Sequence, residues 1–355
     1  MSTLIYKCPH CGAVLEYDAE TELMTCDHCH STFTPQEAME EAMREEGPQE
    51  QTEQTEQTEQ DRAFEESISA YHCPSCGAEI MTDANTTATF CTFCGSPTII
   101  PSKLSGIYRP ASVIPFKISK EQAQEAFKKW CRNGRFTPRD FASPQELEKL
   151  TGLYVPFWLF DCTVDGGMTA NATRVRTWPM GDYLYTNTKY YAVRRRAIME
   201  YDKVPADGSL QLEDGTMDLL EPYDYQELEA FQMPYLAGFQ AEKFDQTPKD
   251  VYPRIKERLD GYTRQKVRDT IVGYTTVTNV QFQNVYRGTN AVYTLLPVWI
   301  HRYRYQGQTY QFAMNGQTGK IIGTPPVDRK RVVAWFGGIA AGIFAVLFMG
   351  GMLFL

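Results

Sequence analysis

The sequence has few of the residues and motifs that mark an active site. Of its five histidines, only His301 lies outside the two cysteine-rich segments, and no serine or cysteine nucleophile motif accompanies it. We expect His301 to be a surface residue of a strand. The stretch GQTGK, residues 316–320, is not a phosphate-binding loop, because such a loop needs a glycine five residues before Gly319 and Met314 stands there. These absences predict a protein that is not an enzyme.

Basic residues are scarce near the N-terminus. Residues 1–34 contain Lys7 as their sole Lys or Arg, and residues 71–102 contain neither. A phosphate backbone is bound chiefly by basic side chains that displace counterions. The charge of these segments therefore argues against nucleic acid as a partner, and we expect protein partners instead.

An apolar leader is also missing, since MSTLIYKCPH has no hydrophobic signal-peptide core. We therefore expect the chain to remain in a reducing compartment, where cysteines persist as thiols rather than disulfides.

What the sequence does contain is a repeated cysteine pattern. YKCPHCGA begins at residue 6 and YHCPSCGA at residue 71, and each opens a C-x2-C-x14-C-x2-C segment. Each Cys-x2-Cys turn can place two thiolates on one metal, and two such turns complete a tetrahedron around zinc. With no open coordination position, both metals are expected to be structural. We predict two Zn²⁺ ions, bound by Cys8, Cys11, Cys26 and Cys29 and by Cys73, Cys76, Cys91 and Cys94.

A redox dithiol is the main alternative for these cysteines. A redox motif needs one low-pKa pair, however, and does not explain two spaced pairs in each copy. His10, His28 and His30 lie beside ligand positions. They are expected to be exposed loop residues, with metal substitution or hydrogen bonding to the ligands as the alternative.

An acidic segment separates the two cysteine patterns. Residues 36–66 hold twelve acidic residues against two arginines, three consecutive TEQ triplets and few large apolar side chains. Such a composition buries too little surface to offset the entropy of ordering. We expect a disordered linker over residues 35–68, with a short helix at 36–46. This linker would connect the two cysteine-rich segments, which we call zinc ribbons, in a flexible way.

The C-terminus has the opposite composition. Residues 332–355 contain no charged side chain, and three basic residues precede them at 329–331. Such a run is long enough to cross a ~30 Å hydrocarbon core, and the basic flank favours the cytoplasmic side. We predict a transmembrane tail anchor over 328–355, in a single-pass protein of the cell membrane whose N-terminal bulk is cytoplasmic. Gly338 and Gly342 form a G-x-x-x-G pair that could support a homo-oligomer.

Residues 105–327 are expected to form an α+β body of helices and antiparallel sheet. A capping box at Ser119 and Gln122 predicts one helix, and residues 253–271 predict another. Strands rich in aromatic and β-branched residues are expected around them, with turns at 165–167 and 181–182. The apolar-Pro-apolar-Trp motif occurs at residues 155–158 and again at 296–299, which suggests two similar halves.

Four arginines are candidates for a binding surface in this body. Their spacing places Arg174 and Arg176 on one face of a strand, and Arg194 and Arg196 on one face of the next. If the strands pair, the four could form a cationic patch for anionic lipid headgroups or an acidic partner, although a solvated strand face is the simpler interpretation.

The chain resembles a known family in several long motifs besides the ribbons. These are IPFKISKEQA, GLYVPFWLFD, LEPYDYQELEAF, YLAGFQAEKFD and the segment from LLPVWIHRYRYQ to GKIIG. They are similar to the transcription-factor-IIB-type zinc-ribbon membrane proteins of Gram-positive bacteria. The resemblance implies a role near phage-shock-protein-A-like and SPFH-domain proteins in the envelope stress response. A helicase name sometimes given to the family finds no support, because the chain has no Walker loop.

The sequence thus predicts a membrane-anchored adaptor with ribbons at 1–34 and 69–104, whose aromatic residues Phe33, Phe90 and Phe93 suit docking to proteins. A membrane-tethered nucleic-acid binder, relying on the four arginines, is the alternative.

Overall fold

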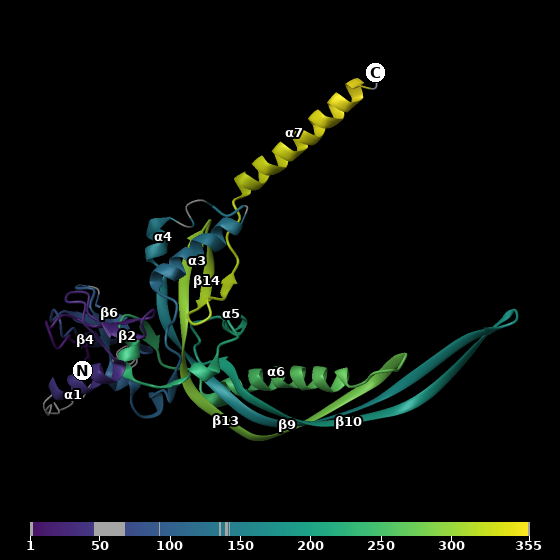
Figure 1. Ribbon diagram of the computed structural model, residues 1–355, viewed down its shortest axis with the longest axis horizontal. Coiled ribbons are helices and arrows are strands. Elements are labelled where there is room, and N and C mark those ends of the chain that lie inside the picture. The colour runs from purple at the N-terminus through teal and green to yellow at the C-terminus, as the bar shows by residue number, and fades with distance from the viewer. Residues whose placement is uncertain are drawn as a thin grey trace, which may run out of the picture.

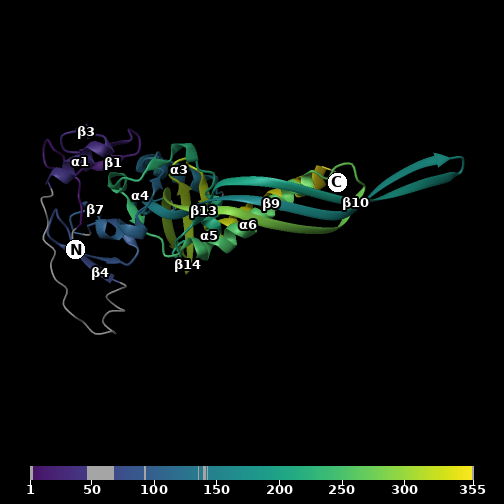
Figure 2. The same cartoon turned by 90° about the horizontal axis from the view of Figure 1, so that it is seen from below.

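The computed structural model of the protein describes residues 3–45, 68–91, 93–134, 136–138, 141 and 143–353. Two small ribbons lie at one end of a mixed helix and sheet body, and an arm of long strands extends from the other side (Figures 1 and 2). The predicted α+β body is present.

The first ribbon is a three-stranded antiparallel sheet followed by a helix. Its strands are β1 (Glu16–Asp18), β2 (Leu23–Thr25) and β3 (Thr32–Phe33), and α1 covers Pro35–Glu45. This helix occupies the place where a short helix was predicted at the start of the linker. The rest of the predicted linker, residues 46–67, lies outside the described residues.

The second ribbon is divided between two sheets. The hairpin of β4 (Ile68–His72) and β5 (Glu79–Asp83) stands alone, whereas β6 (Thr86–Phe90) and β7 (Pro97–Ile99) belong to the large ten-stranded sheet. They join it through β12 (Gln240–Glu242), where Ala241 pairs with Ala88 of β6. The second ribbon is therefore built into the body.

The first ribbon is also docked rather than freely tethered. The backbone N–H of Tyr17 donates to the carbonyl of Ala237 at 3.0 Å, and the Tyr17 ring meets Tyr235 edge-on with 5.4 Å between centroids. Leu4 forms a backbone bridge with Ile99 at the end of the second ribbon. These contacts hold both ribbons against one body. The prediction of flexibly tethered ribbons did not include this docking.

Three long strands form the arm and run back into the body. They are β9 (Thr151–Met180), β10 (Tyr183–Asp207) and β13 (Thr276–Tyr305), with β9 between the other two. The helix α6 (Pro248–Asp269) covers one face of the arm (Figure 1). Its buried side is Val251, Ile255, Leu259, Thr263 and Val267.

The turn predicted at residues 165–167 is wrong, because β9 continues through them. A Cβ placed at Gly166 would lie only 2.5 Å from Cγ2 of Thr263, so the glycine lets α6 approach the strand closely. The turn predicted at 181–182 is correct and joins β9 to β10.

Shorter elements complete the body. The helices are α3 (Lys120–Asn133), with the predicted capping box at Ser119, α4 (Pro144–Glu148) and α5 (Asp214–Leu219). The strands are β8 (Ser112–Val113), β11 (Glu229–Ala230), β14 (Gln308–Asn315) and β15 (Ile321–Gly323), and 3₁₀ turns lie at Pro101–Leu104, Gly106–Tyr108, Tyr225–Glu227 and Met233–Leu236.

The body contains two equivalent units that meet where β9 and β13 pair. One unit runs β8–α3–β9 and the other β12–α6–β13, and the first strand of each lies parallel to the long strand of the other. The indole of Trp158 donates to the carbonyl of Gln246 at 2.9 Å, and the indole of Trp299 donates to that of Ile118 at 3.0 Å. Each acceptor lies one residue before the N-cap of the other unit's helix.

Two glycines repeat the same relationship. Gly208 donates to the carbonyl of Pro156 and Gly316 to that of Pro297, both at 2.8 Å. The carbonyl of Gly208 accepts from the N–H groups of residues 245 and 246, as that of Gly316 does from residues 117 and 118. The two apolar-Pro-apolar-Trp motifs therefore occupy matching surroundings, as expected of two similar halves.

The C-terminal segment forms the helix α7 (Arg329–Leu353), which leaves the body (Figure 1). The three basic residues predicted to precede the apolar segment lie in the first turn of this helix. Over the described part of the chain, no helix combines the length and apolarity that a membrane crossing requires. The predicted transmembrane tail anchor, and with it the single-pass membrane localisation, is therefore wrong.

Candidate metal centres and the cleft beside them

The cysteines of each ribbon converge on one point. In each cluster, the four cysteine sulfurs all lie within 4.8 Å of one another, so that each cluster could hold a metal ion. The first cysteine of every Cys-x2-Cys pair is buried: Cys8, Cys26, Cys73 and Cys91.

The four turns that carry these cysteines share one backbone geometry. In each, the N–H four residues after the first cysteine donates back to its carbonyl at 2.8 Å. The donor residue has positive φ and is Gly12, Gly77 or Gly95 in three turns, with φ of 75–76°. In the fourth turn the donor is His30, with φ of 58°. Glycine adopts this left-handed conformation without steric cost, which accounts for the residue type in three of the four turns.

The sulfur spacing matches tetrahedral zinc coordination. Cys8 and Cys29 are 3.5 Å apart, as are Cys11 and Cys26, and the equivalent distances in the second cluster are 3.7 and 3.8 Å. A Zn–S bond of about 2.3 Å places tetrahedral sulfurs about 3.8 Å apart. The donor set therefore fits zinc, and it leaves no coordination position for a substrate.

Hydroxyl groups adjoin the last cysteine of each cluster. Ser31 Oγ lies 3.3 Å from Cys29 Sγ, and Ser96 Oγ lies 3.3 Å from Cys94 Sγ. Hydrogen bonding from the serine side chain and backbone lowers the pKa of both thiols to about 6, which favours the thiolate that a metal binds. His10 Nδ1 contacts the same Ser31 hydroxyl at 2.8 Å. His10 is therefore linked to Cys29 through the hydroxyl group of Ser31.

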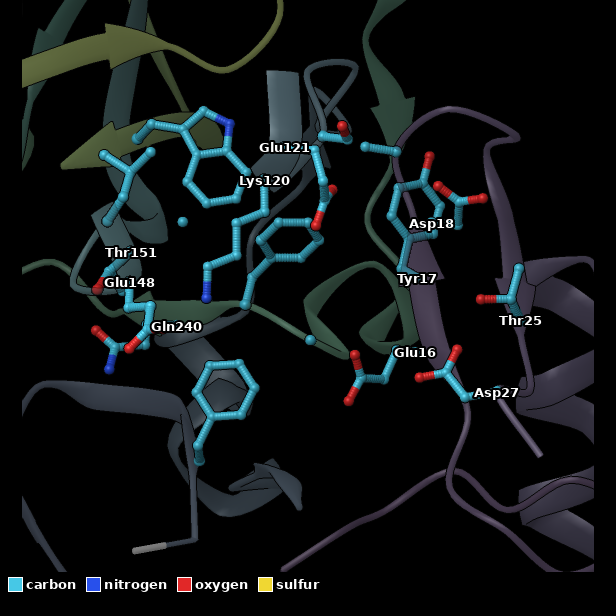
Figure 3. A pocket seen from close by; sticks show the side chains of 18 residues that line it. Glu16, Tyr17, Asp18, Thr25, Asp27, Lys120, Glu121, Glu148, Thr151 and Gln240 are labelled. Carbon is cyan, nitrogen blue, oxygen red and sulfur yellow. The ribbon is translucent and has the colours of Figure 1, made fainter. Parts of the chain in front are cut away.

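A cleft of about 560 Å³ lies beside the metal centres, where the ribbons meet the body (Figure 3). Strand β1 supplies Glu16, Tyr17 and Asp18 on one side, and the start of α3 supplies Lys120 and Glu121 on the other. The aromatic rings that line it are Tyr17, Phe90, Phe239 and Trp299. Phe90 ends β6, directly before the metal ligand Cys91, so both ribbons contribute walls.

The cleft is strongly acidic. Its lining includes five carboxylates, Glu16, Asp18, Asp27, Glu121 and Glu148, against the single cation of Lys120. Withdrawal from water raises the pKa of Glu16, the negative charge of Asp27 raises it further, and Lys120 opposes both effects. A positively charged ligand would relieve this repulsion.

The aromatic residues predicted for docking have three different surroundings. Phe93 is 73% exposed, Phe90 lines the cleft, and Phe33 packs edge-on against His10 with 5.4 Å between centroids.

The four candidate arginines do not form one patch. Arg174 pairs across the ladder with Lys189 and Arg176 with Asn187, whereas Arg194 faces Thr169 and Arg196 faces Gly167. Counting along β9 and β10 in this register places the two arginine pairs on opposite faces. Sequence spacing alone could not give this result, because it depends on the turn that sets the register.

Two of these arginines also have partners within the arm. The guanidinium of Arg174 donates to the carbonyl of Gly273 at 2.9 Å and lies over the rings of Tyr191 and Tyr274. Arg196 binds both carboxylate oxygens of Asp165, at 2.6 and 2.8 Å.

His301 is buried, which corrects its expected place on the surface of a strand. Only 1% of it is exposed, and it packs against Phe127 with 5.4 Å between ring centroids. Its Nε2 lies 3.3 Å from the carboxylate of Glu146 on α4. Burial lowers the pKa of His301, and Glu146 opposes that shift. No sequence pattern indicates this contact, because α4 and β13 are far apart in the chain.

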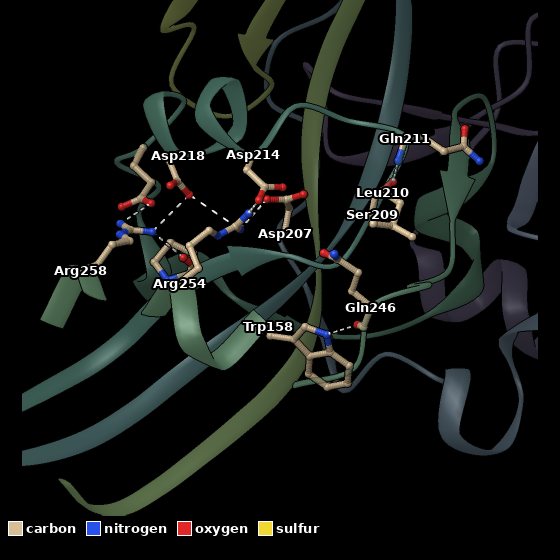
Figure 4. A network of polar contacts seen from close by, with 12 residues as sticks. Trp158, Asp207, Ser209, Leu210, Gln211, Asp214, Asp218, Gln246, Arg254 and Arg258 are labelled. Atoms are coloured by element: carbon tan, nitrogen blue, oxygen red, sulfur yellow. Dashed lines mark hydrogen bonds and ion pairs between the residues drawn. The ribbon is translucent and has the colours of Figure 1, made fainter. Parts of the chain in front are cut away.

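A second polar cluster, which the sequence did not predict, joins α6 to the strand and helix before it (Figure 4). Arg254 binds the fully buried Asp207 at 2.6 Å and Asp214 at 2.5 Å. Arg258 binds Glu221 at 2.7 Å and donates to the carbonyl of Pro205 at 2.7 Å. Because all these carboxylates have cationic partners, we interpret the cluster as a structural one that holds α6 against the preceding strand and helix.

The fold and its sites define a class of protein: an α+β body of two equivalent units that carries two docked, four-cysteine metal ribbons. No family model matches the sequence, and no solved structure matches it. The chain is 41% identical over 347 residues to the uncharacterized protein YdjG of Bacillus subtilis (strain 168), and the match covers 96% of each chain. The chain therefore belongs to the same family as YdjG.

Proposed function

We propose that the protein is an adaptor that docks a partner protein at the cleft between its ribbons and its body. The observation that carries this proposal is that both ribbons and the body line one acidic cleft. The two metal centres hold zinc in a structural role, since each has four cysteines at tetrahedral spacing.

The chemistry of the cleft selects a partner segment with cationic side chains. Five carboxylates against one lysine give the cleft a net charge of −4, and each zinc with four thiolates adds about −2 nearby. The partly exposed aromatic ring of Phe90 lies in the same lining, where a lysine or arginine stem can pack over it. SPFH-domain and phage-shock-protein-A-like proteins are the first partners to test.

Fluorescence anisotropy with a labelled lysine–serine peptide tests the charge preference. The wild type should bind this peptide more tightly than the same peptide with glutamate in place of lysine. The triple variant Glu16→Gln/Asp27→Asn/Glu121→Gln should weaken binding by about 10-fold or more, since it removes three facing charges.

The matched control is Glu213→Gln/Glu257→Gln/Asp269→Asn, which changes the net charge equally but lies outside the residues that line the cleft. This control should bind as the wild type does, and all three proteins should contain two zinc ions. Equal weakening by both triple variants, or equal binding of the glutamate peptide, would refute docking at the cleft.

A further inference from the structure

The arm has two long edges that differ in how well they are protected. Among the described residues, β10 pairs only with β9, and β13 in the arm pairs only with the other side of β9. The edge of β13 is interrupted by register shifts near Asn279 and Gly288, both at positive φ. Such bulges discourage pairing with another chain. The edge of β10 keeps an unbroken register over a longer stretch, from Tyr183 to Tyr201, and its register shift comes only at Asp202 and Lys203, where Lys203 has positive φ.

The exposed face of this β10 edge carries a self-complementary charge pattern. Its side chains alternate in exposure, with the odd-numbered residues from 191 to 201 turned toward the side covered by α6 and the even-numbered ones toward solvent. The outward residues read Arg194, Arg196, Ile198, Glu200 and Asp202 along the strand. Two cations, one apolar residue and two anions therefore follow one another on one face.

We propose that β10 pairs with β10 of a second copy of this chain, antiparallel, about a two-fold axis at Ile198. This register sets Arg196 opposite Glu200 of the partner subunit and Arg194 opposite Asp202 of the partner subunit, while the two Ile198 side chains meet at the axis. Opposite charges directly across a strand pair are favourable, and a two-fold axis makes every such contact occur twice. The two arms form one continuous six-stranded sheet.

The exposure of these side chains agrees with this interface. Ile198 is 68% exposed in the single chain, an unusual setting for a large aliphatic residue in the middle of a strand. Arg196 already binds Asp165 and Asp202 contacts Lys203, but neither Arg194 nor Glu200 has an ion-pair partner among the described residues. The pairing of two copies gives Arg194 and Glu200 one partner each.

The same register gives the tip of the arm a surface to pack on. Beyond Thr173, β9 and β10 run as a two-stranded hairpin with Met180, Tyr183 and Leu184 each more than 60% exposed, and such a hairpin is marginally stable alone. The tip lies about 50 Å from Ile198 along the strand, whereas Asp207 lies about 30 Å away on the other side. The tip of one copy therefore reaches alongside the body of the other.

Sedimentation velocity of the full chain over a wide concentration range tests the proposal. The wild type should form a dimer. Ile198→Lys puts two like charges at the axis and should weaken dimerisation by about 100-fold or more. Val285→Lys is the matched control: Val285 lies on β13, is 45% exposed and pairs with Asp165 of β9, away from the free edge of β10, so this variant should dimerise as the wild type does.

A charge exchange tests the register itself. Arg194→Glu and Asp202→Lys should each weaken the dimer by about 10-fold, and the double variant should recover most of the loss because the new charges face each other. Circular dichroism should show every variant folded. A wild type that stays monomeric, a dimer that survives Ile198→Lys, or one that Val285→Lys disrupts instead would overturn the proposal.

Discussion

At position 30 a histidine occupies a backbone conformation that the three equivalent turns give to glycine. A side chain in the left-handed region costs roughly 1 kcal/mol. His30→Gly should therefore raise the stability of the first ribbon by up to about 1 kcal/mol, measured as slower zinc loss to a chelator. A variant that loses zinc faster would show that His30 contributes to holding the metal.

Gly316 tests the contact between the two equivalent units. A Cβ at this position would lie 2.7 Å from the ring of Phe116 and 2.8 Å from Pro297, whereas nothing lies within 4 Å of one added at Gly215. Gly316→Ala should destabilise the protein by about 1–3 kcal/mol through overpacking, and Gly215→Ala should not. Urea unfolding measures both, and equal midpoints would contradict the tight packing described at Gly316.

The two four-cysteine clusters could be predicted at the residue scale because they depend on local spacing. Two cysteines two residues apart already share one turn, whatever the rest of the fold. The place of His301 could not be predicted in this way, since its burial depends on α3 and α4 packing over β13.

At the scale of elements, α6 is held to the strand and helix before it by buried charge. Asp207 is fully buried, and Arg254 is its cation. Arg254→Met leaves that carboxylate unpaired, which should cost about 3–5 kcal/mol. Arg264→Met, which removes a cation stacked on the ring of Phe282, should cost far less. Thermal unfolding compares the two, and a similar loss in both would show that the cluster around Arg254 is unimportant.

Glu242 on β12 should make the stability of the protein depend on pH. Burial raises the pKa of Glu242 above its ordinary value of 4.5, although a hydrogen bond from Ser209 opposes the shift. Because the folded pKa is raised, the associated stability is present below pH 4.5 and is lost as pH rises through the folded pKa. Glu242→Gln should therefore be more stable than the wild type at pH 7 and equal to it below pH 4.5.

Urea unfolding across this pH range measures the difference, with the exposed Glu257→Gln as control. A pH-independent difference would assign the effect to packing rather than to charge.

Helices could be predicted at this scale where a local capping motif marks their first residue, as the capping box at Ser119 does for α3. The arm was less predictable. Glycines at 166 and 167 have the composition of a turn, but they lie within one 30-residue strand because α6 presses on it. The faces of the arginines depend on the hairpin register, which no pattern of spacing reveals.

For the whole molecule, the two ribbons should respond differently to metal loss. The second ribbon contributes β6 and β7 to the ten-stranded sheet, while the first has a sheet of its own. Cys73→Ser/Cys91→Ser should therefore lower the unfolding temperature of the body more than Cys8→Ser/Cys26→Ser does. Scanning calorimetry measures both, and the reverse order would contradict the integration of the second ribbon into the body.

Zinc and docking should also be linked, because the ribbons that bind the metal form walls of the cleft. The direct test is anisotropy titration of the lysine–serine peptide into zinc-loaded protein, into protein stripped with a chelator, and into stripped protein after zinc is restored. Peptide affinity that falls when zinc is removed and returns when it is restored is the expected result. Affinity that is unchanged by zinc removal would contradict a docking cleft built by the metal ribbons.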